Sequence, residues 1–279
     1  MTGAAACLMM LPSMGGSISL GLAALLTLLP AAVLPPRCGG NGGWLFWALL
    51  VVAALGPLVI EIAAQGGIWR TGFSATLWTI IASTMLVYLL ACLASPTARG
   101  LRVFLLPYLA ALGVIALLWS AAPENELPAS SMTAGLQVHI GVSLVTYALI
   151  TLAAASALAV WVKECALRRH KAPGWIDDIP SVADGERVQN RLLLAAEIVL
   201  GLGLATGIAA NFYRGGALVP LDHKTILSLA AFVVVGILLS VQRVRGLRGR
   251  QAARLVLAAY LLVTLAFPGV KFVTDVILY

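Results

Sequence analysis

The chain has 279 residues, of which 61% are hydrophobic and only 10% are charged, with a formal net charge of +7. A soluble domain usually has about a quarter of its residues charged, so this composition excludes an ordinary soluble protein. Apolar runs of about 20 residues, separated by short stretches of glycine, proline and charged residues, are typical of a protein that crosses a membrane several times. Because lipid offers no partner for backbone N–H and C=O groups, each run is expected to be a helix.

About eight membrane-spanning helices are predicted in chain order from these runs. They cover residues 14–34, 44–64, 73–94, 101–121, 135–162, 190–212, 224–242 and 252–276. The predicted fold class is therefore an all-α integral membrane bundle, organised as a single polytopic domain over residues 1–279.

The basic residues fall mainly in every second connection between the predicted spans. One side of the membrane receives 14 of the 18 Lys and Arg residues: Arg37, Arg99, Arg102, Lys163, Arg168, Arg169, Lys171, Arg187, Arg191, Arg243, Arg245, Arg248, Arg250 and Arg254. The other side receives Arg70, Arg214, Lys224 and Lys271. Short loops rich in Lys and Arg stay in the cytoplasm, so both termini are expected outside, in a bacterial-type inner membrane. The positive charge thus indicates topology and contact with the lipid bilayer, not nucleic-acid binding.

The connections differ in length and content. The longest inner connection, residues 163–191, mixes charged residues with Pro and Gly, and we expect an ordered surface loop with little core. Two outer connections, 122–134 and 213–223, are either caps over a site near the membrane surface or simple turns. The four cysteines, Cys7, Cys38, Cys92 and Cys165, lie far apart without a CxxC spacing, which favours small apolar-type residues over a redox role.

Three histidines are the first candidates for chemistry. His170 lies among Arg168, Arg169 and Lys171 and is expected to be a solvated loop residue. By contrast, His139 begins the fifth span and His223 precedes the seventh, so both are expected at the outer side.

The fifth span begins "GLQVHIGVSLVTYALI", with polar residues at helical spacing. At about 100° per residue, four polar residues fall on one helix face, which we call the polar stripe: His139, Ser143, Thr146 and Tyr147. Polar side chains in a membrane helix turn toward the bundle interior, since facing lipid is costly. Two interpretations follow: hydrogen bonding between helices, or a neutral imidazole presented to a metal or haem.

Two carboxylates also lie within predicted spans. Glu197 lies about two turns inside the sixth span, where it is expected to pair with Arg191 or to be protonated, with an ion or proton path as a further alternative. Glu61, near the end of the second span, is placed where its carboxylate can reach the membrane surface.

From residue 135 onward the chain resembles the cytochrome c assembly family, the CcsA/HemX-like proteins. The resemblance is carried, in order, by "VHIGVSLVTYAL", "GERVQNRLL…GLGLATG", "DHKTILSLAAF" and "GLRGRQAA…LVTLAFPGVKFV". In the first 130 residues it extends only to the pattern of spans. Family members that attach haem to apocytochromes have a tryptophan-rich outer segment flanked by histidines that ligate haem iron.

This chain departs from that ligase pattern. The outer segment "NFYRGGALVPLDHK" keeps Asn211, Asp222 and Lys224 but contains no tryptophan, and the family's second histidine, expected near the end of the seventh span, is absent. The pattern therefore fits the HemX-like branch better than a full haem ligase, and it favours an accessory protein over an enzyme.

The resemblance implies a membrane protein that binds or handles haem in cytochrome c biogenesis. It implies His139 as an axial ligand of the haem iron; His223, on the same membrane face, is a second candidate by geometry alone. Ser143, Tyr147, Asn211 and Asp222 are the remaining candidates for the haem site. The expected partners are haem and other proteins of cytochrome c maturation or haem biosynthesis.

Two alternatives remain open. The first is a regulator or scaffold of haem biosynthesis that binds no haem and acts through its basic inner loops. The second is a small-solute transporter that uses Glu197 and the polar stripe. Transport predicts broken helices in paired positions of two halves, and no such pairing is present in the sequence.

Overall fold

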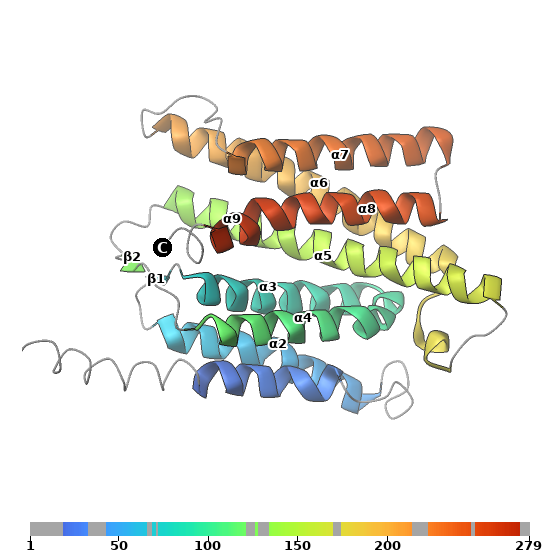
Figure 1. Ribbon diagram of the computed structural model, residues 1–279, viewed down its shortest axis with the longest axis horizontal. Helices are drawn as coiled ribbons and strands as arrows, with labels where there is room; N and C mark the ends of the chain where they lie inside the picture. The colour runs from blue at the N-terminus through green and yellow to red at the C-terminus, as the bar shows by residue number, and fades with distance from the viewer. Residues whose placement is uncertain are drawn as a thin grey trace, which may run out of the picture.

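A computed structural model describes residues 19–32, 43–65, 69–70, 72–120, 126–127, 134–169, 174–213, 223–246 and 249–273. Long helices lie side by side along one axis and alternate in direction (Figure 1). The helices are Ser19–Ala32, α2 (Trp44–Gln65), α3 (Phe73–Ala94), η2 (Pro96–Leu101), α4 (Arg102–Leu118), α5 (Ala134–Arg169), η4 (Gly174–Asp178), α6 (Val182–Tyr213), α7 (His223–Arg245), α8 (Gly249–Thr264), the π-helical η5 (Leu265–Gly269) and α9 (Val270–Phe272).

The all-helical architecture predicted from the apolar runs is confirmed. Within the described ranges, six helical segments are long and apolar enough to cross a membrane, and Ser19–Ala32 and Trp44–Val59 are shorter apolar helices. Eight membrane crossings and the outer position of both termini stay predictions. At one end of the bundle α5 ends and α6 and α8 begin; this end carries most of the basic residues, and we call it the basic end. The opposite end is the predicted outer end.

Two short strands join connections at the outer end. β1 (Trp69–Arg70) pairs antiparallel with β2 (Glu126–Leu127), so that Trp69 is opposite Leu127 and Arg70 is opposite Glu126. The connection between α2 and α3 is thereby bonded through its backbone to the connection between α4 and α5. The segment 122–134 therefore contributes a strand instead of a plain turn.

Two helices extend well beyond the thickness of a bilayer. α5 has 36 residues and α6 has 32. At about 1.5 Å per residue α5 is roughly 54 Å long, against about 30 Å for the hydrocarbon core. The prediction of one connection over 163–191 is therefore wrong: its first seven residues belong to α5 and its last ten to α6. The end of an apolar run predicts where a helix leaves the lipid, but the helix itself can continue into water beyond that point.

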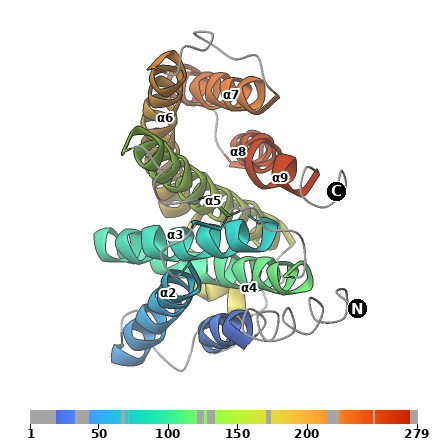
Figure 2. The ribbon, with the colours of Figure 1, turned by 90° about the vertical axis from the view of Figure 1, so that its left-hand side faces the viewer.

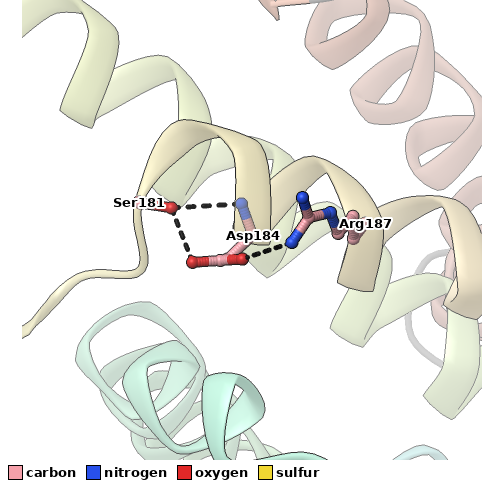
Figure 3. Close-up of polar contacts among 3 residues, drawn as sticks. All are labelled: Ser181, Asp184 and Arg187. Carbon is pink, nitrogen blue, oxygen red and sulfur yellow. Dashed lines mark hydrogen bonds and ion pairs between the residues drawn. The ribbon is translucent and has the colours of Figure 1, made fainter.

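Local polar contacts explain why α6 begins so early (Figure 3). The amide of Asp184 donates to Ser181 Oγ at 3.2 Å, and Ser181 Oγ donates to the Asp184 carboxylate at 2.7 Å. Arg187 pairs with the other carboxylate oxygen at 2.9 Å. A serine at the N-cap with an acidic residue three positions later satisfies free amides of the first turn. Helix α6 therefore begins eight residues before the predicted span.

The remaining inner loop has an apolar anchor, so the expectation of little core is also wrong. Ile176 and Ile179 are only 4% and 3% exposed. Lys163 Nζ of α5 donates to the carbonyl of Ile176 at 2.6 Å. A Cβ atom on Gly100 of η2 would lie 2.8 Å from the Asp178 carbonyl oxygen, so η2 and η4 approach each other closely. The loop folds back onto the bundle because its two isoleucines are removed from water there.

Helix α5 is the central element. It lies between α3 and α4 on one side and α6, α7 and α8 on the other (Figure 2). Its middle, "ITLAAASALA" over residues 150–159, is rich in alanine and mostly buried. Small side chains let helices approach closely in a membrane, where packing and hydrogen bonds replace the hydrophobic effect between helices.

Three tyrosines meet near the middle of the bundle, one each from α4, α5 and α8. The hydroxyl of Tyr147 lies 3.2 Å from that of Tyr108 and 3.4 Å from that of Tyr260. The Tyr260 hydroxyl donates to Tyr108, which closes the triangle. Each hydroxyl has one hydrogen to donate and can accept another, so the three groups satisfy one another without water. This tyrosine triad joins the two sides of the bundle.

We predict that Tyr147→Phe lowers the free energy of unfolding by about 1 kcal/mol, a common scale for hydrogen bonds between membrane helices. The ring contacts with Tyr260 and Phe267 are kept in this variant. Tyr147→Ala is expected to cost about 3 kcal/mol, because it also leaves a cavity. Reversible unfolding of the detergent-solubilised protein measures both values. Equal stability of wild type and Tyr147→Phe would contradict a stabilising role for the triad.

Candidate functional site

His139 lies in the second turn of α5 at the outer end, half-buried against α6. Its Nδ1 atom is 3.3 Å from Thr206 Oγ1. The ring lies over Gly207, where an added Cβ atom would be 3.1 Å from Cε1. The absence of a side chain at Gly207 thus leaves room for the imidazole between the two helices.

The hydrogen bonds around Thr206 determine which ring nitrogen of His139 carries the proton. Thr206 Oγ1 donates its only hydrogen to the Gly203 carbonyl at 3.0 Å. It therefore accepts from the His139 Nδ1–H group, and in the neutral imidazole this tautomer leaves the lone pair on Nε2. Within the described part of the chain, Nε2 has no hydrogen-bond partner. Metal-binding histidines are held in the same way, with the second ring nitrogen bonded to an orienting group.

The other residues of the polar stripe do not gather around His139. Ser143 donates to the His139 carbonyl and Thr146 to the Val142 carbonyl, both at 2.8 Å within α5. Tyr147 turns to the tyrosine triad instead. Thr146 and Tyr147 are buried, as expected of an inward face. The polar stripe of α5 is therefore divided: His139 contacts α6, whereas Tyr147 contacts α4 and α8.

The remaining predicted site residues lie at the outer ends of α6 and α7. Asn211 is four residues beyond Gly207, so it lies one turn further out on the same face of α6. Phe212 next to it is 60% exposed. His223 begins α7, but its side chain and the whole of Asp222 lie outside the described residues, so their part in the site stays a prediction.

An aromatic cluster that was not predicted from the sequence lies at the outer end. Phe73 of α3, Trp119 after α4 and Phe272 of α9 have ring centroids 5.3–6.5 Å apart. The sequence signal was an aromatic residue at the outer end of each of three spans, the position of the interfacial aromatic belt. The cluster fills the ends of α3, α4 and α9, whereas His139 faces α6.

The comparison with known protein families decides the family. The cytochrome c assembly protein family matches residues 43–278, which is most of the chain. The protein belongs to this family. The family match reaches well upstream of residue 135, where the recognisable sequence motifs begin.

Two relatives extend the comparison. An Azospirillum brasilense protein named "Uncharacterized 28.8 kDa protein in nifR3-like 5'region" is 44% identical over 95% of this chain and all of its own length. The inner membrane protein YpjD of Escherichia coli K12 is 28% identical over 88% of this chain and 94% of its own. No solved structure matches the chain significantly. This member of the cytochrome c assembly family is thus a multi-pass membrane protein.

The two carboxylates within the spans have different surroundings in this family member. In the described structure Glu197 does not pair with the exposed Arg191: its Oε2 atom is buried without a hydrogen-bond partner, and its Oε1 atom lies close to Gly236 of α7. A protonated Glu197 stays a prediction. Glu61 is only 9% exposed, and its Oε1 atom lies 3.0 Å from Thr79 Oγ1 of α3, within hydrogen-bond distance.

Two of the four cysteines lie among the described residues. Cys92 is buried and Cys165 is half-buried, and both are free thiols. Cys7, Cys38 and His170 lie outside the described residues. Across the ranges that the structure describes, no three His, Cys, Asp or Glu side chains gather into a metal-binding group.

We predict that Thr206→Val changes the tautomer of His139, because the acceptor for Nδ1–H is lost. Nitrogen-15 NMR of histidine-labelled protein in nanodiscs distinguishes the two tautomers, and His139→Ala assigns the signal among three histidines. Thr146→Val is the matched control, because Thr146 bonds only within α5. A His139 signal unchanged by Thr206→Val would refute the assigned hydrogen bond.

Proposed function

We propose that this protein binds haem during cytochrome c biogenesis, with His139 Nε2 as an axial ligand of the iron. The observation that carries the proposal is the hydrogen bond between Nδ1 and Thr206, which places the lone pair of the neutral imidazole on Nε2 at the outer end of the bundle. Membership of the cytochrome c assembly family supports haem as the cargo. A neutral imidazole is a common protein ligand of haem iron.

The residues present fit one side of a haem. The porphyrin supplies four nitrogen ligands, so the protein has to provide only one or two more. Thr206 holds the imidazole in orientation, and Gly207 gives the ring its space. Phe212 offers an exposed apolar ring near the same end of α6, and Asn211 lies one turn outside Gly207. Bound haem supplies the iron centre that is destined for a c-type cytochrome; the chain's own residues hold and orient it.

We further propose an accessory role of the HemX-like kind in an inner membrane. The outer segment without tryptophan argues against a complete haem ligase. The name of the Escherichia coli relative, an inner membrane protein, supports this location. His223 is proposed as the second axial ligand, and other proteins of cytochrome c maturation or haem biosynthesis are the proposed partners.

We predict that the purified protein takes up haem with a Soret absorption band that His139→Ala abolishes. Thr206→Val is expected to weaken haem binding about tenfold, the lower end of the effect of losing an orienting partner. Ser143→Ala is the matched control, because Ser143 lies one turn away and bonds only to its own helix. His223→Ala tests the second ligand by a shift of the same band.

Two outcomes would contradict these proposals. A wild-type protein that stays colourless after haem addition would refute haem binding and favour a scaffold that acts through its basic loops. A deletion strain with an unchanged content of c-type cytochromes would refute the assembly role, even if haem binds in vitro.

A further inference from the structure

Two arginines at the basic end lie on aromatic rings of α2. The guanidinium carbon of Arg99 is 5.2 Å from the ring centroid of Trp47, and that of Arg102 is 5.5 Å from the ring centroid of Phe46. Both rings belong to the first turn of α2, and the arginines lie three residues apart, at the end of η2 and the start of α4. The structure thus holds two cations next to each other over neighbouring rings.

The backbone that carries these arginines is held in place. The hydroxyl of Tyr88, a fully buried residue of α3, donates to the Arg99 carbonyl at 3.1 Å. On the other side Gly100 packs so closely against Pro180 that an added Cβ atom would lie 2.7 Å from its ring. A site held by fixed neighbours binds a ligand with little loss of conformational freedom.

The charge of Arg102 is not compensated by the part of the protein that the structure describes. Arg102 takes part in neither the Arg168–Glu164 nor the Arg187–Asp184 ion pair. The Nη2 atom of Arg102 is buried and has no hydrogen-bond acceptor. A buried donor without an acceptor is costly, and more so on a charged group. An anion from outside the chain would compensate this charge at the half-buried Arg102 side chain.

An apolar stripe leads away from the two arginines. Val51, Leu55 and Val59 follow Trp47 at intervals of four residues on α2, and these three side chains are 38%, 46% and 59% exposed. Residues spaced by four lie on one helix face, so the stripe extends about 18 Å along the helix from Trp47. Trp44, 82% exposed, marks the end of α2 at the level expected for interfacial aromatic residues.

We infer that Arg102, with Arg99, binds the phosphate of an anionic membrane lipid whose acyl chain lies along the α2 stripe. A guanidinium group offers two parallel N–H donors, which match the oxygens of a phosphate. The basic end of the bundle attracts anionic headgroups, and the exposed valines and leucine accept a hydrocarbon chain. A soluble phosphate would use only the arginines and leave the stripe without a role. The site is separate from His139, which lies at the opposite end.

The test is lipid binding to the full-length protein in detergent, measured by native mass spectrometry with phosphatidylglycerol and with phosphatidylcholine. We predict that phosphatidylglycerol binds preferentially to the wild type and that Arg102→Gln weakens this binding about fivefold. Arg243→Gln, at an exposed arginine in the last turn of α7, is the matched control and should bind as the wild type does. Arg102→Lys should bind with intermediate strength, because it keeps the charge but loses the paired donors.

A competition with inorganic phosphate and further variants identify the ligand. If inorganic phosphate displaces phosphatidylglycerol at equal molar concentration, the site takes a soluble anion and the lipid proposal is overturned. Equal binding by wild type, Arg102→Gln and Arg102→Lys also overturns it. If Arg102→Gln does not fold, Leu55→Asn on the exposed stripe provides the test: it should weaken phosphatidylglycerol binding, and unchanged binding contradicts the proposal. The haem Soret band should be unaffected in every variant, which keeps this test independent of the haem proposal.

Discussion

The absence of hydrogen-bond partners in lipid is the constraint on which this bundle depends. Polar side chains within the spans have to be satisfied by other helices or by their own backbone. The tyrosine triad joins α4, α5 and α8; Thr79 and Glu61 join α3 and α2; His139 and Thr206 join α5 and α6. Helix α5 takes part in two of these three contacts, which is consistent with its central, deeply buried position.

The two ends of the bundle present different chemistry. The outer end carries an imidazole whose Nε2 atom has no hydrogen-bond partner among the described residues. The basic end carries guanidinium groups stacked on aromatic rings, and in the described structure the buried Nη2 atom of Arg102 has no acceptor. A neutral nitrogen lone pair suits a metal ion, whereas a cationic N–H group suits an oxyanion. The haem proposal and the lipid proposal therefore concern separate surfaces of one molecule.

Much of the fold could be predicted because membrane thickness imposes its length on apolar runs. The third span, predicted at 73–94, coincides with α3. The loop 163–191 could not be predicted in the same way. Its helical ends are stabilised by the Arg168–Glu164 ion pair and by the Ser181 N-cap. These polar contacts cannot be predicted from the lengths of apolar runs. The tyrosine triad was also missed, because Tyr147 was identified as polar while its partners lie 39 and 113 residues away.

The sequence by itself determined the membrane class, the positions of most helices and the choice of His139 as the leading candidate. The first two conclusions need only composition and apolar run length, whereas the choice of His139 also needs the charge distribution, the polar helix face and the resemblance to the cytochrome c assembly family. Tertiary structure alone decided which nitrogen of His139 is free and which helices the stripe residues reach. It also brought Arg99 and Arg102 onto α2. Each of these three features depends on contacts between helices that are far apart in the chain. Helical periodicity predicts which face of its own helix a residue occupies, but not which other helix packs against that face.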